Sequence, residues 1–112
     1  KILSTGNGRC NISNININAP FDSYYSTNSN FYLNCLNKFD VEYTKNIFLS
    51  LGLPLISLEN GKLFPKSLQA SSVVDILKMS LEERNIPIYT NCKVTNIFKG
   101  FKIETNNEEF PT

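Results

Sequence analysis

Near the beginning of the chain, two glycines, an arginine, a cysteine and an asparagine stand close together in the stretch Ser4-Thr5-Gly6-Asn7-Gly8-Arg9-Cys10-Asn11. Glycines one residue apart permit positive φ and a close approach by a ligand, and successive N–H groups in such a bend form an anion-binding concavity. The arginine adds a planar, permanently charged fork that can bind a phosphate through two hydrogen bonds. These residue types at this spacing indicate a phosphate-binding loop. For an isolated G-x-G, the alternative is an ordinary solvated turn.

Three cysteines, Cys10, Cys35 and Cys92, are widely spaced, and the chain has no histidine and no C-x-x-C pair. We therefore expect reduced thiols, with no zinc or other metal site, no papain-like nucleophile and no disulfide scaffold. Because free cysteines are usually buried, Cys35 and Cys92 are predicted to be small core residues. For Cys10 two interpretations stand: a reactive thiol beside Arg9, or a residue that packs in the core or contacts a cofactor.

Length and charge exclude several classes of protein. The 112 residues suffice for one domain with a modest core, and the hydrophobic fraction of 41% predicts a folded chain. The formal net charge is +1 with both signs interspersed, so we expect neither nucleic acid nor an anionic membrane as a partner. No apolar run reaches the roughly 18 residues of a membrane-spanning helix, and no signal peptide is visible. A cytoplasmic location is expected.

Apolar residues at helical spacing predict the helices that must support the loop. One is expected from Ser29 to about Lys38, and a second from the N-cap Asp40 to a stop at Gly52. A third is expected over about residues 68–84. Ser72 and Asp75 would form a capping box if that third helix starts there, and a short strand is expected at 86–89. The apolar stripes of these helices are predicted to form the core.

Two β-hairpins are expected between and after the helices. The first turns through Asn60-Gly61, because both central residues of a type I′ turn need positive φ. With that two-residue loop, Glu59 and Lys62 would face each other as a cross-strand charge pair. The second hairpin is expected about Lys99-Gly100, with Phe101, Ile103 and Thr105 on one face, and the polar tail 106–112 is expected to fray.

Two blocks of the sequence resemble one protein family. S-T-G-N-G-R-C-N-I-S-N, at 4–14, is similar to the S-G-G-G-R-C-N-x-T-N signature of bacterial NAD(P)/FAD-dependent oxidoreductases, also described as aminoacetone-oxidase-family FAD-binding enzymes. The runs G-L-P, E-N-G-K-L-F-P and A-S-S-V-V-D resemble the family's G-L-P, E-x-G-R-x-F-P and A-x-x-V-x-D in order and spacing. Lys62 stands where the family usually has arginine. The resemblance covers nearly the whole chain.

The resemblance implies an α/β fold, with three helices, short strands and two hairpins as part of a Rossmann-like FAD-binding fold. It also implies cofactor-binding residues, namely Gly6, Gly8, Arg9, Cys10, Asn11 and Val94. Arg9 would compensate the pyrophosphate charge of FAD or fix the loop, Asn11 would orient a polar edge of the cofactor, and the backbone of Val94 would contact the adenine. FAD and a small-molecule substrate are the expected partners, with NAD(P)H as a candidate electron donor. No catalytic residue is implied.

The resemblance further implies that the chain is an internal fragment. In the family, the strand and helix with G-x-G-x-x-G and the ribose-binding acidic residue precede this signature. We expect a single unit, 1–112, divided into a signature loop (1–27), a helical pair (28–52), a hairpin (53–66) and a final helix, strand and hairpin (67–112). The remainder of the same polypeptide would complete an oxidoreductase, and the isolated fragment would be inactive. The alternative is a stand-alone, non-catalytic ligand- or protein-binding module of the same ancestry.

Overall fold

The computed structural model describes residues 1–28, 30–100, 102–106 and 109–111. Its elements are η1 (Ile2–Gly8), β1 (Ser13–Asn14), α1 (Asn30–Lys38), α2 (Val41–Ser50), β2 (Leu55–Ser57), η2 (Glu59–Gly61), β3 (Lys62–Pro65), α3 (Ala70–Glu83), β4 (Val94–Phe98), β5 (Lys102–Thr105) and β6 (Glu109–Pro111). The elements labelled η are short 3-10 helices. The described strands form a first sheet in the order β1-β3-β2 and a second sheet in the order β4-β5-β6, both antiparallel.

The first sheet is built around β3, which is buried over most of its length. β2 pairs with β3 as a hairpin, so that Ile56 lies opposite Phe64. β1 arrives from the N-terminal part of the chain and pairs Ser13 with Leu63. Leu63 is 2% exposed, because β1 and β2 pair with the two edges of β3 and α3 packs against that strand. The first sheet therefore joins segments that are far apart in the sequence.

The core lies where the N-terminal loop, the end of α2 and the start of α3 meet. Its buried residues are Cys10, Leu53, Ala70 and Val73, and further hydrophobic side chains on α2, β2 and α3 pack around them. Cys10 is thus a small apolar core residue. Its φ of 59° is unusual for a non-glycine residue, and the packing around the side chain holds it in that conformation.

Helix α2 begins and ends as the sequence predicts. Asp40 is the N-cap, and its Oδ1 accepts a hydrogen bond of 2.7 Å from the Tyr43 N–H. At the other end, Gly52 has a φ of 87°. The N–H of Leu53 donates to the Phe48 carbonyl at 2.8 Å, and that of Gly52 to the Leu49 carbonyl. These two bonds form a Schellman motif, in which glycine takes the left-handed position that a side chain would strain.

Helix α3 starts earlier than a capping box at Ser72 and Asp75 requires. The helix begins at Ala70, and its N-cap Gln69 makes no side-chain capping bond, so that capping box is wrong. The C-terminal end closes on Asn85, which has a φ of 54°. The N–H of Ile86 then donates to the Leu81 carbonyl at 2.9 Å. Asparagine here takes the left-handed position that glycine takes after α2.

The connection between β2 and β3 is longer by one residue than a type I′ turn. The Leu58 N–H donates to the Lys62 carbonyl at 2.9 Å, which leaves Glu59–Gly61 as a three-residue loop. Asn60 and Gly61 both have positive φ, as Asn-Gly predicts. The extra residue moves Glu59 out of register with Lys62, so the expected charge pair between these two described residues does not form.

Two further expectations differ from the structure. Residues 86–89, where a short strand was expected, form no strand. Cys35 is exposed and Cys92 half-buried, so the burial predicted for Cys35 is wrong. The helical stripe on α1 has little to pack against, which explains the exposure of Cys35.

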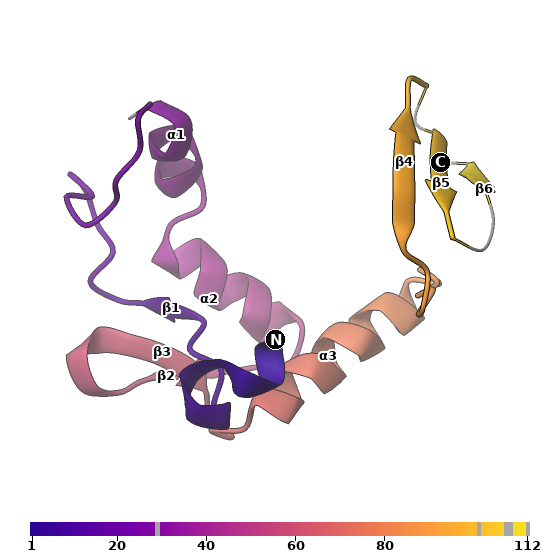
Figure 1. Cartoon of the computed structure of the whole chain (residues 1–112). Helices are drawn as coiled ribbons and strands as arrows, with labels where there is room; N and C mark the ends of the chain where they lie inside the picture. The colour runs from indigo at the N-terminus through magenta and orange to yellow at the C-terminus, as the bar shows by residue number, and fades with distance from the viewer. Residues whose placement is uncertain (29, 101, 107–108, 112) are drawn as a thin grey trace.

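The second sheet is a local meander at the C-terminal end. Ile97 pairs with Ile103 across the predicted hairpin, and Phe101 lies outside the described residues. β6 pairs with β5 where a frayed tail was expected, with Glu104 opposite Glu109. The second sheet stands beyond the far end of α3 (Figure 1), and every residue of β4 is exposed. The radius of gyration of 17.4 Å exceeds the about 13 Å of a compact domain of this length, in keeping with that separation.

Within the described ranges, no helix has the length and apolar character needed to cross a membrane.

Candidate functional site

The signature loop folds back on itself immediately after its first helical turn. Thr5 has extended angles, and Gly6 and Asn7 both have a φ of 55°. The backbone thereby reverses, and the Cys10 N–H donates to the Thr5 carbonyl at 3.0 Å while the Arg9 N–H donates to the Gly6 carbonyl at 3.2 Å. The loop is therefore closed by its own backbone, with Arg9 at its outer side and Cys10 directed into the core.

The two glycines of the loop have different surroundings. A Cβ on Gly6 would lie 2.8 Å from the Asn11 nitrogen and 3.1 Å from Cε1 of Phe64. The close approach that Gly6 permits is thus made by the chain itself. A Cβ on Gly8 would meet only the Leu3 carbonyl oxygen, at 4.0 Å. Open space beside Gly8 leaves its backbone accessible to a ligand.

Arg9 is held in place by two contacts. Its guanidinium carbon lies 4.7 Å from the centroid of the Phe64 ring, and its Nε donates to the Gly6 carbonyl at 3.3 Å. Phe64 is itself only 3% exposed, so it offers a fixed aromatic face. No residue in the described part of the chain accepts a hydrogen bond from the terminal N–H groups of Arg9. These groups are free to bind an anion bidentately.

Asn11 fastens the loop to the first sheet. Its Nδ2 donates to the carbonyls of Ser13 at 2.9 Å and Leu63 at 3.0 Å. The backbone continues this connection, since the Ile12 N–H donates to the same Leu63 carbonyl at 2.8 Å. The amide oxygen of Asn11 has no partner among the described residues and the side chain is exposed, so this oxygen can accept a hydrogen bond from a ligand.

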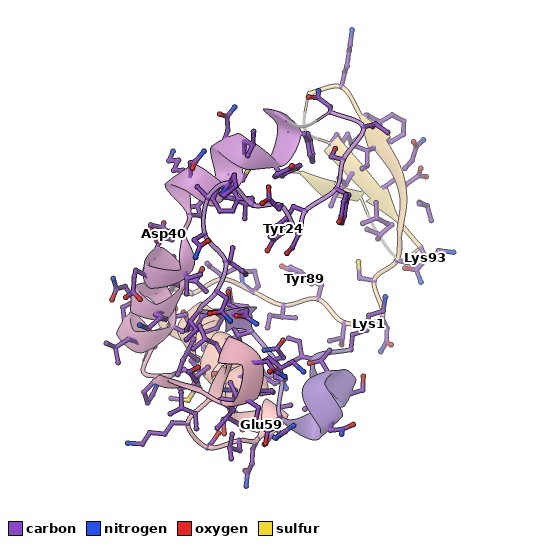
Figure 2. The ribbon with its side chains drawn as sticks, turned by 90° about the vertical axis from the view of Figure 1, so that its left-hand side faces the viewer. Lys1, Tyr24, Asp40, Glu59, Tyr89 and Lys93 are labelled. Carbon is purple, nitrogen blue, oxygen red and sulfur yellow. The ribbon has the colours of Figure 1, made fainter. Side chains whose placement is uncertain are left out.

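A small cavity of about 170 Å³ opens next to Arg9. It is lined by Arg9, Leu58, Glu59, Lys62 and Phe64. Glu59 is labelled in Figure 2 on the hairpin, close to the N-terminal coil. Of these five residues, only Arg9 was predicted from the sequence as a site residue; Leu58, Glu59, Lys62 and Phe64 were not. One signal was available, since the run E-N-G-K-L-F-P carries part of the family resemblance, as the signature loop does.

Val94 is not brought to the other five predicted site residues. It begins β4 and is 48% exposed. The second sheet to which it belongs lies past the C-terminal end of α3, whereas the signature loop lies against the start of that helix (Figure 1). Lys93, directly before β4, lies on the opposite side of the molecule from Asp40 (Figure 2). The structure thus groups Gly6, Gly8, Arg9, Cys10 and Asn11, and it leaves Val94 apart.

Comparison with known proteins gives two findings. A family model described as "HI0933-like protein Rossmann domain" matches residues 1–112. A curated protein, the 3-dehydro-bile acid delta(4,6)-reductase of Clostridium scindens, is 38% identical over 114 residues, which cover 99% of this chain and 27% of that reductase. The chain therefore spans little more than a quarter of the length of this relative.

Proposed function

The chain belongs to the HI0933-like Rossmann domain family, and from that premise we propose that it is the part of an FAD-dependent reductase that holds the phosphates of the cofactor. Family membership confirms the resemblance drawn from the signature loop and the Rossmann-like α/β class. The proposal rests mainly on the position and the unpaired N–H groups of Arg9. Its guanidinium is half-buried and anchored on Phe64, and its terminal N–H groups have no acceptor in the described chain.

The residues of the loop fit a dinucleotide in three respects. Arg9 offers a fixed cation for a phosphate, Gly8 offers an open backbone beside it, and the Asn11 oxygen offers an acceptor for a hydroxyl or ring N–H. Because the loop is closed by its own hydrogen bonds, little ordering is required when a ligand binds. Gly6 and Cys10 support this arrangement from inside the fold, since Gly6 leaves the space beside Phe64 that a Cβ would enter, and Cys10 lies in the core.

FAD, when bound, would supply the electron transfer, and the chain would bind it, orient it and limit its access to water. The role of Arg9 in such a protein is electrostatic. A charge-assisted hydrogen bond contributes about 1.5 to 3 kcal/mol, and a guanidinium already fixed on an aromatic ring loses little side-chain entropy on binding.

The class of reaction is proposed from the relative. That protein is named as a reductase of a dehydro bile acid. We extend to this chain only the reaction class, the reduction of a small organic substrate, with NAD(P)H as the electron donor. We propose that the adenine contact of Val94 forms only in a polypeptide of a length comparable to that relative, because the exposed β4 would then have partners to pack against.

The experiment is FAD retention by the polypeptide that carries this chain. Arg9→Ala should weaken FAD binding by about 10- to 100-fold, which is the equivalent of the charge-assisted bond that it removes. Arg84→Ala is the matched control, since Arg84 is exposed and its side chain bonds only to Ser80 within the described residues. Absorbance of the purified protein and fluorescence titration with FAD give the readout. Equal retention in the two variants would refute the proposed role of Arg9, and a wild-type protein without flavin would refute the function.

A further inference from the structure

We propose that the cavity between the signature loop and the β2–β3 hairpin is an oxyanion pocket, in which Lys62 supplies a second cation beside Arg9. The pocket would take one phosphate or carboxylate group. This inference rests on the proposed function and deepens it, because it assigns half of the anion site to the hairpin and names a residue there. The group could be a phosphate of the cofactor or a carboxylate of the substrate. Both are small, planar or tetrahedral groups of negatively charged oxygens.

The size of the cavity fits such a group. Its volume of about 170 Å³ is several times the roughly 30 Å³ that one water molecule occupies in the liquid. That is room for a phosphate or carboxylate group together with bound waters. The pocket can therefore hold the charged end of a larger molecule whose remainder lies outside.

The position of Lys62 follows from the geometry of β3. Residues two apart on a strand share a face, so the side chains of Lys62 and Phe64 lie on the same side of β3. Phe64 carries the guanidinium of Arg9 on that side. Lys62 is exposed, and no carboxylate of the described chain lies within ion-pair distance of its nitrogen. A flexible ammonium next to a fixed guanidinium can close on an anion from the open side of the pocket.

The pocket also contains one negative charge, and this charge gives the inference its sharpest consequence. Glu59 lines the cavity with the two cations, and it forms an ion pair with neither of them in the described structure. Among the described residues, Lys45 and Glu42 on α2 form an ion pair with each other. A carboxylate near the bound oxyanion repels it, so removal of that charge should tighten binding.

The test is a calorimetric titration of the polypeptide that carries this chain with inorganic phosphate, pyrophosphate and acetate at low salt. Lys62→Ala should weaken phosphate binding about three- to tenfold, and Lys62→Arg should retain it. Glu59→Gln should tighten binding by about two- to fivefold. Lys66→Ala is the matched control, because Lys66 is an exposed lysine that follows β3 and lines a different cavity.

The inference is overturned if Lys62→Ala and Lys66→Ala have the same effect, or if Glu59→Gln fails to tighten binding. A merely structural role of the hairpin predicts no gain of affinity from Glu59→Gln.

Phosphate and pyrophosphate binding that competes with FAD identifies the cofactor's phosphate as the occupant. Acetate binding that leaves FAD in place identifies a substrate carboxylate. A protein without FAD whose phosphate affinity still follows Lys62 and Glu59 would refute the proposed function and support the pocket. If the protein retains FAD but Lys62→Ala and Glu59→Gln leave the phosphate affinity unchanged, the pocket is refuted and the proposed function is not.

Discussion

The two sheets in the described part of the chain each have three antiparallel strands, yet they are stabilised in different ways. In the first sheet, Ser13 pairs with Leu63, which stands 50 positions later in the sequence. Its central strand carries Leu63 at 2% exposure. The second sheet is a meander of neighbouring strands, and Ile97 on its edge strand is 73% exposed. One sheet depends on burial between distant segments, and the other on local pairing.

Stability and the candidate site are both concentrated in the first sheet. Bringing distant segments together costs loop-closure entropy, which is offset only by buried contacts. The first sheet has those contacts, and the same contacts position Arg9. A sheet of three strands is stable only when its apolar face packs against another part of the protein. The second sheet lacks such a surface within the described residues, so most of its apolar side chains contribute little stability here.

The largest effect is expected from the core strand. Leu63→Ala should lower the free energy of unfolding by about 2 to 5 kcal/mol, because it leaves a cavity at the centre of the first sheet. Ile97→Ala, the corresponding change on the second sheet, should cost under about 1 kcal/mol, because that side chain is already in water. Urea denaturation followed by circular dichroism measures both. Similar losses would show that the second sheet is packed as tightly as the first.

A smaller difference is expected between two glycines with positive φ. Gly6→Ala should cost about 2 to 3 kcal/mol, because it adds a contact of 2.8 Å with the Asn11 nitrogen to a strained backbone. Gly100→Ala in the β4–β5 turn should cost about 1 kcal/mol, the strain of the left-handed conformation alone, since nothing lies within 4 Å of its Cβ position. Thermal unfolding of the two variants tests this ranking. A greater loss for Gly100→Ala would reverse the comparison.

The smallest effects are expected at the helix starts. Asp40→Ala should cost about 1 kcal/mol, because it removes the cap of α2, which packs on the first sheet. Gln69→Asp should raise the free energy of unfolding by a few tenths of a kcal/mol up to about 1 kcal/mol. Gln69 makes no capping bond but has the extended backbone of an N-cap, so an aspartate there can cap α3. Chemical denaturation of these two variants against wild type is sufficient. A neutral Asp40→Ala would mean that α2 is held by the sheet alone.

Local features of the fold were predictable from the sequence. Asp40 and Gly52 mark the ends of α2 through their own side-chain and backbone properties, and Lys99-Gly100 marks the turn of the second sheet. The loop after Leu58 was predicted with the right residues and the wrong length. Asn-Gly fits the positive-φ positions of both a two-residue and a three-residue hairpin, and the strand register decides between them.

Part of the candidate site was predictable in the same way. The residue types of Gly6, Gly8, Arg9 and Asn11 indicate an anion-binding loop without knowledge of any partner. That Arg9 would rest on Phe64 was not predictable, because nothing local relates two residues that far apart. Cys10 and Cys35 show the same limit, since identical side chains have opposite burial and only the packing of α3 against the loop distinguishes them.

From the sequence, the three α-helices, the two ends of α2, the second hairpin and the residue types of the loop were predictable, because these follow from backbone preferences and short-range spacing. The family was predictable from its two motif blocks. The tertiary structure alone decided the pairing of β1 with β3, the seat of Arg9 on Phe64 and the cavity that Lys62 and Glu59 share with it. Each of these is a contact between segments distant in the sequence. Their formation depends on the total buried surface and not on any one residue's preference.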